Sequence, residues 1–276
     1  MKPWAQALLV MVCGWLQGLA WAQQPARVVS LLPSTTELIC RLGACSRLVG
    51  VDQHANHPES IKGLPRMGAL GAWSLEALVR VRPDLVFIPR DPQLAGRLQG
   101  LGIAHRVIDP QNLSEVRQSF EEVAQALGLG AAPGQRLWQE LQDELLTLKR
   151  SLPPNVAGQR VYLEVDSSGV VAGPSSYLGQ LIEALGLVNA VGQSQNPYPQ
   201  VSPESVLRAQ PDWLILMADA ITPVDQRPGW QRLRAVQQSQ VCRYSAREID
   251  VLVRPGPRLD QAARLLTDCV QGRRRG

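Results

Sequence analysis

The sequence lacks the short motifs that mark the commonest catalytic and nucleotide-binding sites. It contains no G-x-S-x-G nucleophile elbow, no Walker-type glycine-rich loop and no H-E-x-x-H zinc motif. The polar residues His105, Asp109 and Asp166 would form a catalytic site only if an assumed fold brought them together. We therefore do not expect this protein to be an enzyme.

A membrane-spanning run is also missing. The apolar stretch from Ala5 to Leu19 is shorter than the ~20 residues of a transmembrane helix, so an uncleaved anchor is the weaker interpretation. It follows Lys2 and ends at Ala20-Trp21-Ala22, an A-x-A cleavage site. Cys13 is not preceded by the small residues of a lipoprotein signal. We expect residues 1–22 to be a cleaved signal peptide and the mature protein to be soluble and periplasmic.

The sequence also lacks a large excess of charge of either sign. Removing residues 1–22 takes one Lys from the 28 basic groups and none from the 24 acidic groups, which leaves a net charge of +3. The clearest basic cluster is the terminal Arg273-Arg274-Arg275. This distribution lacks the basic stripe that binds a phosphate backbone, so we expect no nucleic-acid partner.

Four cysteines remain after the signal peptide, which contains Cys13, is removed. Outside the cytosol they can form two disulfides in three possible pairings. We favour Cys40 with Cys45 and Cys242 with Cys269.

A pattern of a helix followed by a buried strand occurs twice. Ser74, Glu76, Arg80, Pro83 and Asp84 recur as Ser202, Glu204, Arg208, Pro211 and Asp212, at a constant offset of 128. Strand-like runs, Arg27–Leu32 and Arg160–Val165, open the two halves. The first leads into a helix that Ser34 and Glu37, as a capping box, are expected to start. The repeat predicts two lobes of related α/β structure.

A helical stretch without strand character separates these halves. Its leucines, spaced to share one face, are Leu137, Leu141, Leu145 and Leu148. We therefore expect an α/β fold of two related Rossmann-like lobes, residues 23–133 and 153–276, joined by a single long α-helix over residues 134–152. Such a helix would permit only small changes in the angle between the lobes.

Five segments resemble those of the helical-spine class of periplasmic solute-binding proteins, and within it the vitamin B12-binding group. They are Arg27–Glu37 (RVVSLLPSTTE), Leu48–Val51 (LVGV), Ser74–Glu76 with Pro83–Val86, Pro199–Glu204 (PQVSPE) and Arg254–Arg258 (RPGPR). The resemblance covers nearly all of the mature chain. It implies a monomer that holds a corrinoid (cobalamin) as transported ligand between its lobes, has no resident cofactor, and docks on the permease dimer of an inner-membrane ABC transporter.

The resemblance also implies which residues contact the ligand. The matching positions are Pro33, His54, Tyr198, Asp250 and Arg254, and Trp73 lies about three positions from another expected aromatic residue. The better-known members carry Tyr in place of His54 and Trp in place of Tyr198. Two structural alternatives stay open, because Tyr198 could be a loop-packing residue and Asp250 with Arg254 a surface ion pair.

Glu76 and Glu204 are the expected docking residues. Ser74 and Ser202 are predicted helix N-caps, so each Glu lies in a first helical turn, where a carboxylate favours the positive end of the helix dipole. The resemblance implies in addition that the two carboxylates meet arginines of the two permease subunits. The two interpretations are compatible.

The three histidines make a ligand other than a corrinoid possible. His54, His57 and His105 could bind Zn²⁺ together, or one of them could bind haem iron. The alternative function is therefore a haem-binding or ferric-siderophore-binding protein of the same transporter class.

Overall fold

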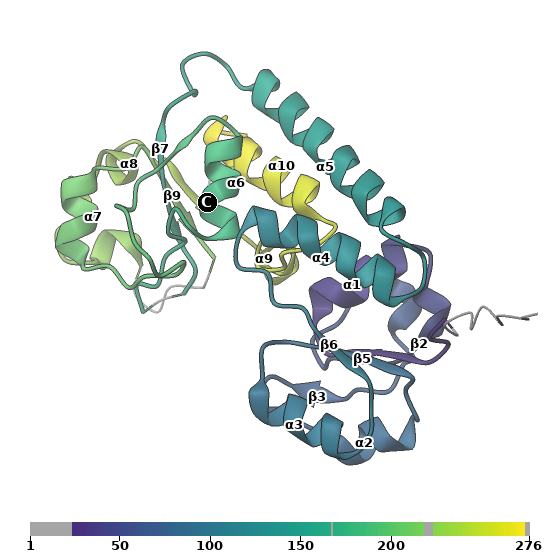
Figure 1. Cartoon of the computed structure of the whole chain (residues 1–276). Coiled ribbons are helices and arrows are strands. Elements are labelled where there is room, and N and C mark those ends of the chain that lie inside the picture. The colour runs from purple at the N-terminus through teal and green to yellow at the C-terminus, as the bar shows by residue number, and fades with distance from the viewer. Residues whose placement is uncertain (1–23, 167, 218–222, 274–276) are drawn as a thin grey trace, which may run out of the picture.

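Two α/β lobes follow one another along the chain and are joined by one long helix (Figure 1). The computed structural model describes residues 24–166, 168–217 and 223–273. The expected signal peptide, residues 1–22, lies outside these ranges. In the described ranges, no helix is both long enough and apolar enough to cross a membrane.

The N-terminal lobe contains a parallel four-stranded sheet with the order β2-β1-β5-β6. Its strands are β1 (Val28–Ser30), β2 (Leu48–Val51), β5 (Leu85–Ile88) and β6 (His105–Val107). A short antiparallel ribbon joins β3 (Gly68–Ala69) to β4 (Ala72–Trp73). The helices are α1 (Pro33–Arg41), α2 (Leu75–Arg80), α3 (Pro92–Gly100) and α4 (Leu113–Ala126), with short 3₁₀ turns at Cys45–Arg47 and Glu59–Ile61.

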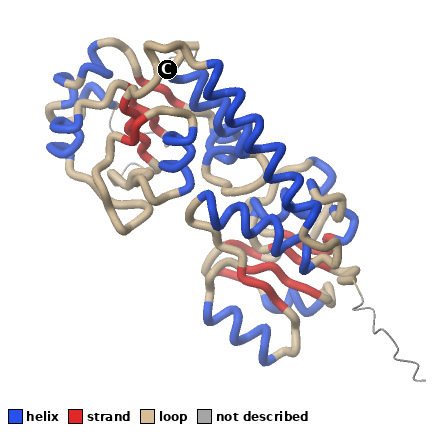
Figure 2. The backbone as a smooth tube through the Cα atoms, turned by 45° about the horizontal axis from the view of Figure 1, so that its top comes forward, coloured by secondary structure: helices blue, strands red, loops and turns tan. Residues whose placement is uncertain are grey.

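The C-terminal lobe repeats this topology with the strand order β8-β7-β9-β10, again all parallel. Its strands are β7 (Arg160–Glu164), β8 (Val188–Asn189), β9 (Trp213–Leu216) and β10 (Val241–Arg243). Its helices are α6 (Tyr177–Ala184), α7 (Pro203–Ala209), α8 (Arg234–Gln237), α9 (Ala246–Leu252) and α10 (Leu259–Val270), with 3₁₀ turns at Val224–Gln226 and Trp230–Arg232. Figure 2 shows the two sheets as separate groups of strands.

Equivalent aspartates explain part of the sequence repeat. Asp84 Oδ2 accepts a hydrogen bond of 2.8 Å from the N–H of Arg27, just before β1. Asp212 Oδ2 accepts one of 2.7 Å from the N–H of Arg160, at the start of β7. Each carboxylate thereby joins the beginnings of two neighbouring strands. The prediction of two related α/β lobes is confirmed.

The connecting helix, α5, runs from Ala132 to Ser151, close to the expected range. Its four spaced leucines are all buried. It packs closely on α4, because a Cβ atom at Gly134 would lie 2.3 Å from the carbonyl oxygen of Phe120. The leucines belong to a cluster of buried apolar residues that continues from β1 and α1 of the first lobe to β7, α6 and α10 of the second. The two lobes therefore share this hydrophobic cluster, and each lobe also has a smaller cluster of its own.

The expected capping box at Ser34 and Glu37 is wrong. Helix α1 begins at Pro33, its N-cap is Leu32, and no side chain caps it. The Glu37 side chain is buried and paired with two arginines of the other lobe. Two guanidinium groups bind a carboxylate more strongly than one local N–H does, so the tertiary contact replaces the capping bond.

Glu37 is the centre of a buried ion-pair network between the lobes. Its Oε1 accepts hydrogen bonds from Arg254 Nη1 at 2.9 Å and from Arg258 Nη2 at 2.6 Å. Its Oε2 accepts one from Arg258 Nε at 2.7 Å. The side chains of Glu37, Arg254 and Arg258 are 2%, 6% and 12% exposed, so little solvent screens these contacts.

Arg254 extends this network to the loop after β2. Its Nη1 donates to Asn56 Oδ1 at 2.8 Å, and its Nη2 donates to the His54 carbonyl at 3.0 Å. Its Nη2 also lies 2.8 Å from Asp250 Oδ1. Asn56 Nδ2 in turn donates to Asp250 Oδ2 at 2.6 Å. Arg254 is buried and Asp250 half-buried, so they form a pair within a network that joins the lobes, and not the surface ion pair of the alternative interpretation.

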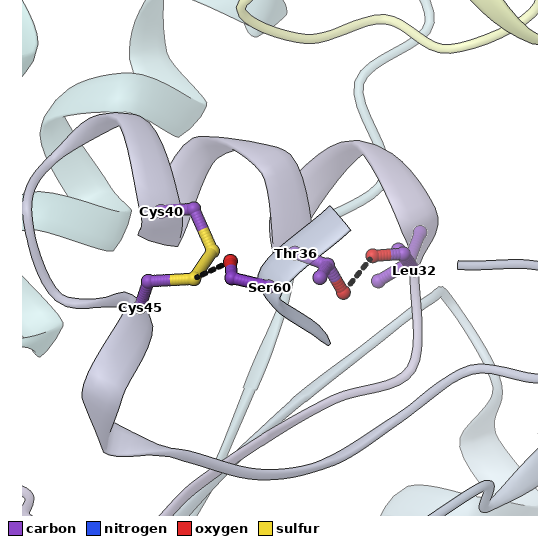
Figure 3. The surroundings of a disulfide bond; sticks show 5 residues. All are labelled: Leu32, Thr36, Cys40, Cys45 and Ser60. Atoms are coloured by element: carbon purple, nitrogen blue, oxygen red, sulfur yellow. Dashed lines mark hydrogen bonds between the residues drawn. A yellow bond between two sulfur atoms is a disulfide. The ribbon is translucent and has the colours of Figure 1, made fainter. Parts of the chain in front are cut away.

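Both favoured disulfides are present. Cys40 at the end of α1 is bonded to Cys45, whose Sγ lies 3.5 Å from Ser60 Oγ (Figure 3). Cys242 in β10 is bonded to Cys269 in α10, so this bridge attaches the last helix to the edge of the second sheet. Cys13 lies outside the described residues.

The two disulfides should contribute unequally to stability. The separation in sequence is 5 residues for Cys40–Cys45 and 27 for Cys242–Cys269. Loop-closure entropy then predicts a loss of about 2 kcal/mol for the double serine variant of the first pair and about 3.5 kcal/mol for that of the second. Urea unfolding of the two variants measures both losses. Equal losses, or a larger loss for the first pair, would contradict the prediction.

Removing Arg254 should destabilise the protein strongly. Arg254→Met leaves the half-buried Asp250 without its guanidinium and the buried Glu37 with one partner fewer, which should cost about 3 kcal/mol. The matched control is Arg117→Met, which breaks the more exposed Arg117–Glu121 pair of α4 and should change stability by about 0.5 kcal/mol or less. Chemical denaturation of both variants tests this, and similar losses would exclude a special role for the buried network.

Candidate functional site: the cleft between the lobes

Two adjoining cavities lie between and beside the lobes. The first has a volume of about 580 Å³ and is lined by both lobes. The second has a volume of about 380 Å³ and is lined by the first lobe. The two share Leu32, Pro33, His54 and Asp109, so they form one continuous cleft. This size is typical of a site for a small molecule.

The cleft lies at the carboxyl ends of the strands. Leu31 follows β1, Asp52 follows β2, Pro89 follows β5 and Asp109 closely follows β6, and all four line the second cavity. Val165 follows β7 and lines the first cavity. Loops at the carboxyl edge of a parallel sheet are the usual place for ligand sites in α/β folds.

All six predicted ligand-binding residues line this cleft. The first cavity is lined by Pro33, His54, Tyr198, Asp250 and Arg254, and the second by Pro33, His54 and Trp73. Pro33 lies at the start of α1, His54 in the loop after β2 and Trp73 at the end of β4. Tyr198 lies in the loop before α7, Asp250 in α9 and Arg254 in the loop after α9. The structure thus brings them together, and a ligand contact for each stays a prediction.

Tyr198 is held in place by two contacts. Its N–H donates to Asn196 Oδ1 at 3.0 Å, and its ring packs against the apolar cluster that the lobes share. Burial raises the pKa of Tyr198 well above its ordinary value; the neighbouring Tyr177 hydroxyl lowers it in part, and the charge of Asp109 raises it. The hydroxyl is therefore neutral at physiological pH.

Sequence reasoning missed Asp109 as a cleft residue. Asp109 lines both cavities, accepts a hydrogen bond of 3.1 Å from Gln111 Nε2, and lies 3.7 Å from the exposed Arg90. Its position directly after a strand-like run was the available signal. Asp52 was missed as well, and burial raises the pKa of its carboxyl, while the N–H of His54 lowers it in part.

The three histidines do not converge. His54 lines the cleft, His57 lines a different cavity next to α5, and His105 lies in β6. The described part of the chain contains no group of three or more His, Cys, Asp or Glu side chains arranged to hold a metal ion. The arrangement therefore does not support a three-histidine zinc site.

The two expected docking residues lie in equivalent helices, α2 and α7, at the outer ends of the two lobes (Figure 1). The predicted N-caps are confirmed, because Ser74 accepts a hydrogen bond from the N–H of Ala77 and Ser202 from that of Ser205. Glu76 is exposed and pairs with Arg80. Neither glutamate lines the cleft.

The charge state of Glu204 follows from its place in the first turn of α7. Its carboxylate is fully exposed, and hydrogen bonds to its own N–H and to the Ser202 side chain lower its pKa. The carboxylate is therefore ionised at physiological pH.

Known proteins share this architecture. Residues 28–248 match the family described as periplasmic binding protein. The chain is 25% identical over 264 residues to the ABC transporter substrate-binding lipoprotein YvrC of Bacillus subtilis, with 90% of this chain and 81% of that protein covered.

Two solved structures illustrate the likeness. The periplasmic haem-binding protein RhuT from Roseiflexus sp. RS-1 is 28% identical with a TM-score of 0.74, covering 89% of this chain and 98% of that one. The periplasmic vitamin B12 binding protein BtuF of Vibrio cholerae is 25% identical with a TM-score of 0.73, covering 90% of this chain and 97% of that one.

These likenesses extend over most of the chain and agree with its two parallel sheets. The predicted fold class is confirmed, and the prediction that the protein is not an enzyme agrees with the match to a family of solute-binding proteins. The chain belongs to the periplasmic binding protein family.

Proposed function

We propose that this protein captures a corrinoid of the cobalamin type in the cleft between its lobes and delivers it to an inner-membrane ABC importer. The observation that carries the ligand class is the charge of the cleft. Among the described lining residues, Asp52, Asp109 and Asp250 are acidic, and the only Lys or Arg is Arg254. Arg254 is already paired within the protein.

Such a cleft suits a ligand that is rich in amides. The periphery of a corrinoid carries amide groups, whose N–H groups require acceptors and no counter-charge. Asp250 lies at the edge of the cleft with its side chain 31% exposed, and Asp109 with 32%. Each carboxylate oxygen can accept more than one hydrogen bond, so both groups can bind a ligand amide in addition to their protein partners.

Apolar and aromatic groups line the same cleft. Leu70 is 75% exposed and Val253 is 39% exposed, so both offer apolar surface to a ligand in the cleft. Trp73 also lines the cleft, with its indole N–H buried and without a hydrogen-bond partner among the described residues. Together with Tyr198, these groups offer the mainly apolar surface that binds a flat macrocycle.

Haem is the second candidate, because His54 lines the cleft and the similar RhuT is a haem-binding protein. Two features weigh against it. Haem carries two propionates, for which the described cleft provides no uncommitted cation. The raised pKa of Tyr198 also opposes the tyrosinate form that would coordinate ferric iron. A ferric siderophore that is anionic meets the same shortage of cations.

Delivery is assigned to Glu76 and Glu204. The glutamates are exposed at corresponding positions of the two lobes, and neither lines the cleft. Arginines on two permease subunits would pair with them without disturbing the ligand. Cleavage after residue 22 and a periplasmic location complete the proposal, whereas the similar YvrC is a lipoprotein.

Ligand titration tests the proposed class. Calorimetry with cyanocobalamin, cobinamide and haem should give the tightest binding for a corrinoid. Tyr198→Ala should weaken corrinoid binding by about tenfold or more, because it removes an aromatic contact surface. The control Tyr198→Phe keeps the ring and should retain most of the affinity. Tighter binding of haem than of either corrinoid would refute the proposal. An unchanged corrinoid dissociation constant in Tyr198→Ala would mean that Tyr198 is a loop-packing residue.

Docking is tested separately from ligand binding. The double variant Glu76→Ala with Glu204→Ala should leave ligand affinity unchanged and abolish capture by the reconstituted transporter. Each single change should weaken docking by about tenfold, because one charge-assisted contact remains. Loss of the helix-dipole interaction alone would lower the melting temperature and spare docking. Normal docking of the folded double variant would refute the assignment.

A further inference from the structure

Glu37 lies next to the ligand cleft without lining it. With Arg258, it lines a separate cavity of about 470 Å³ on the side of the connecting helix, where Leu137 and Leu141 also lie. Of the two described arginines that pair with this carboxylate, Arg254 lines the ligand cleft and Arg258 does not. Arg254 is therefore the contact between Glu37 and the cleft.

Arg254 has little hydrogen-bonding capacity left for a ligand. Its Nη1 donates to Glu37 and Asn56, and its Nη2 donates to the His54 carbonyl and contacts Asp250. These contacts use all the N–H groups of the two terminal nitrogens and leave only the Nε–H of the guanidinium. The residue lines the cleft, yet its terminal donors are already bonded.

The charges of the network also cancel. Glu37 and Asp250 supply two negative charges, and Arg254 and Arg258 supply two positive charges, all within direct contact. Because the network is mainly buried, its charges are weakly screened, and a change of one charge would be felt in the cleft. The balance depends on Glu37, since it pairs with both arginines.

We propose that Glu37 is a specificity-determining residue, which makes the cleft select a neutral, amide-bearing macrocycle over a carboxylate-bearing one. This inference rests on the proposed function and names the residue that controls it. Glu37 neutralises Arg254 and holds its terminal N–H groups toward protein partners. Without that negative charge, the network of Arg254, Arg258 and Asp250 carries a net positive charge next to the cleft, which attracts a ligand carboxylate.

The test compares two corrinoids whose peripheral side chains differ in charge. Cobinamide carries amides, whereas the side chains of cobyrinic acid end in carboxylates. Glu37→Gln should shift the ratio of the two dissociation constants toward cobyrinic acid by at least about tenfold. Arg258→Met leaves the network with a net negative charge and should shift the same ratio in the opposite direction. The matched control is Glu144→Gln, which removes a carboxylate of α5 that pairs with Arg264 outside the cleft and should leave the ratio unchanged.

A purely structural role of Glu37 predicts a different result, namely weaker binding of both corrinoids with a constant ratio. That result in Glu37→Gln and in Arg258→Met would overturn the inference. If Glu37→Gln does not fold, Arg258→Met tests the inference alone, because the ratio of the two dissociation constants must still shift toward cobinamide in that variant. Haem serves as a third probe. If the wild-type protein binds haem and no corrinoid, the proposed function fails, while tighter haem binding by Glu37→Gln and weaker binding by Arg258→Met would still support the role of Glu37.

Discussion

The buried carboxylate of Glu37 is the constraint on which the region between the lobes depends. A charge without water must be paired, and the pairing here comes from Arg254 and Arg258, more than 200 residues further along the chain. Once both guanidinium groups are held, the loop that carries them lies against the start of α1. Gly256 marks how close this approach is, since a Cβ atom there would lie 3.2 Å from the Cβ of Ser34.

The shared hydrophobic cluster also holds the two lobes against each other. Apolar residues of α1, α4, α5, α6 and α10 belong to this cluster, and each lobe has in addition a smaller cluster of its own. A second set of contacts lies on the other side of the first cavity, where the Tyr177 N–H donates to the Gln111 carbonyl at 2.7 Å and the Leu113 N–H to Gln180 Oε1 at 2.9 Å. The cleft is therefore bordered by fixed contacts on both sides, which favours a site that is formed before the ligand arrives.

The same architecture separates the cleft from the helices that carry the two proposed docking residues. The carboxyl ends of both sheets face the cleft, whereas α2 and α7 lie at the outer ends of the lobes (Figure 1). The charged groups of the two regions also differ in their exposure to solvent and in their pairing. Glu204 is fully exposed, and Glu76 is exposed and paired with Arg80, whereas the charges of the network around Glu37 are balanced within the protein. One surface can thus be changed without altering the other.

Local pattern determined much of this protein. The repeated Ser-x-Glu helix starts, the strands after each Pro-Asp and the leucines of α5 are short-range signals, and the structure confirms the elements that they predicted. The resemblance of five segments predicted a common cleft for six residues, and all six line it: Pro33, His54, Trp73, Tyr198, Asp250 and Arg254. Only the tertiary structure decided what Glu37 and Arg254 contact. Glu37 matches a local capping pattern, and the arginines that override it lie in the other lobe, where no pattern of neighbouring residues records them. The place of Asp109 in the cleft was likewise decided by the tertiary structure. Which strand ends lie close together depends on the order of strands in the sheet and not on the order of residues in the chain.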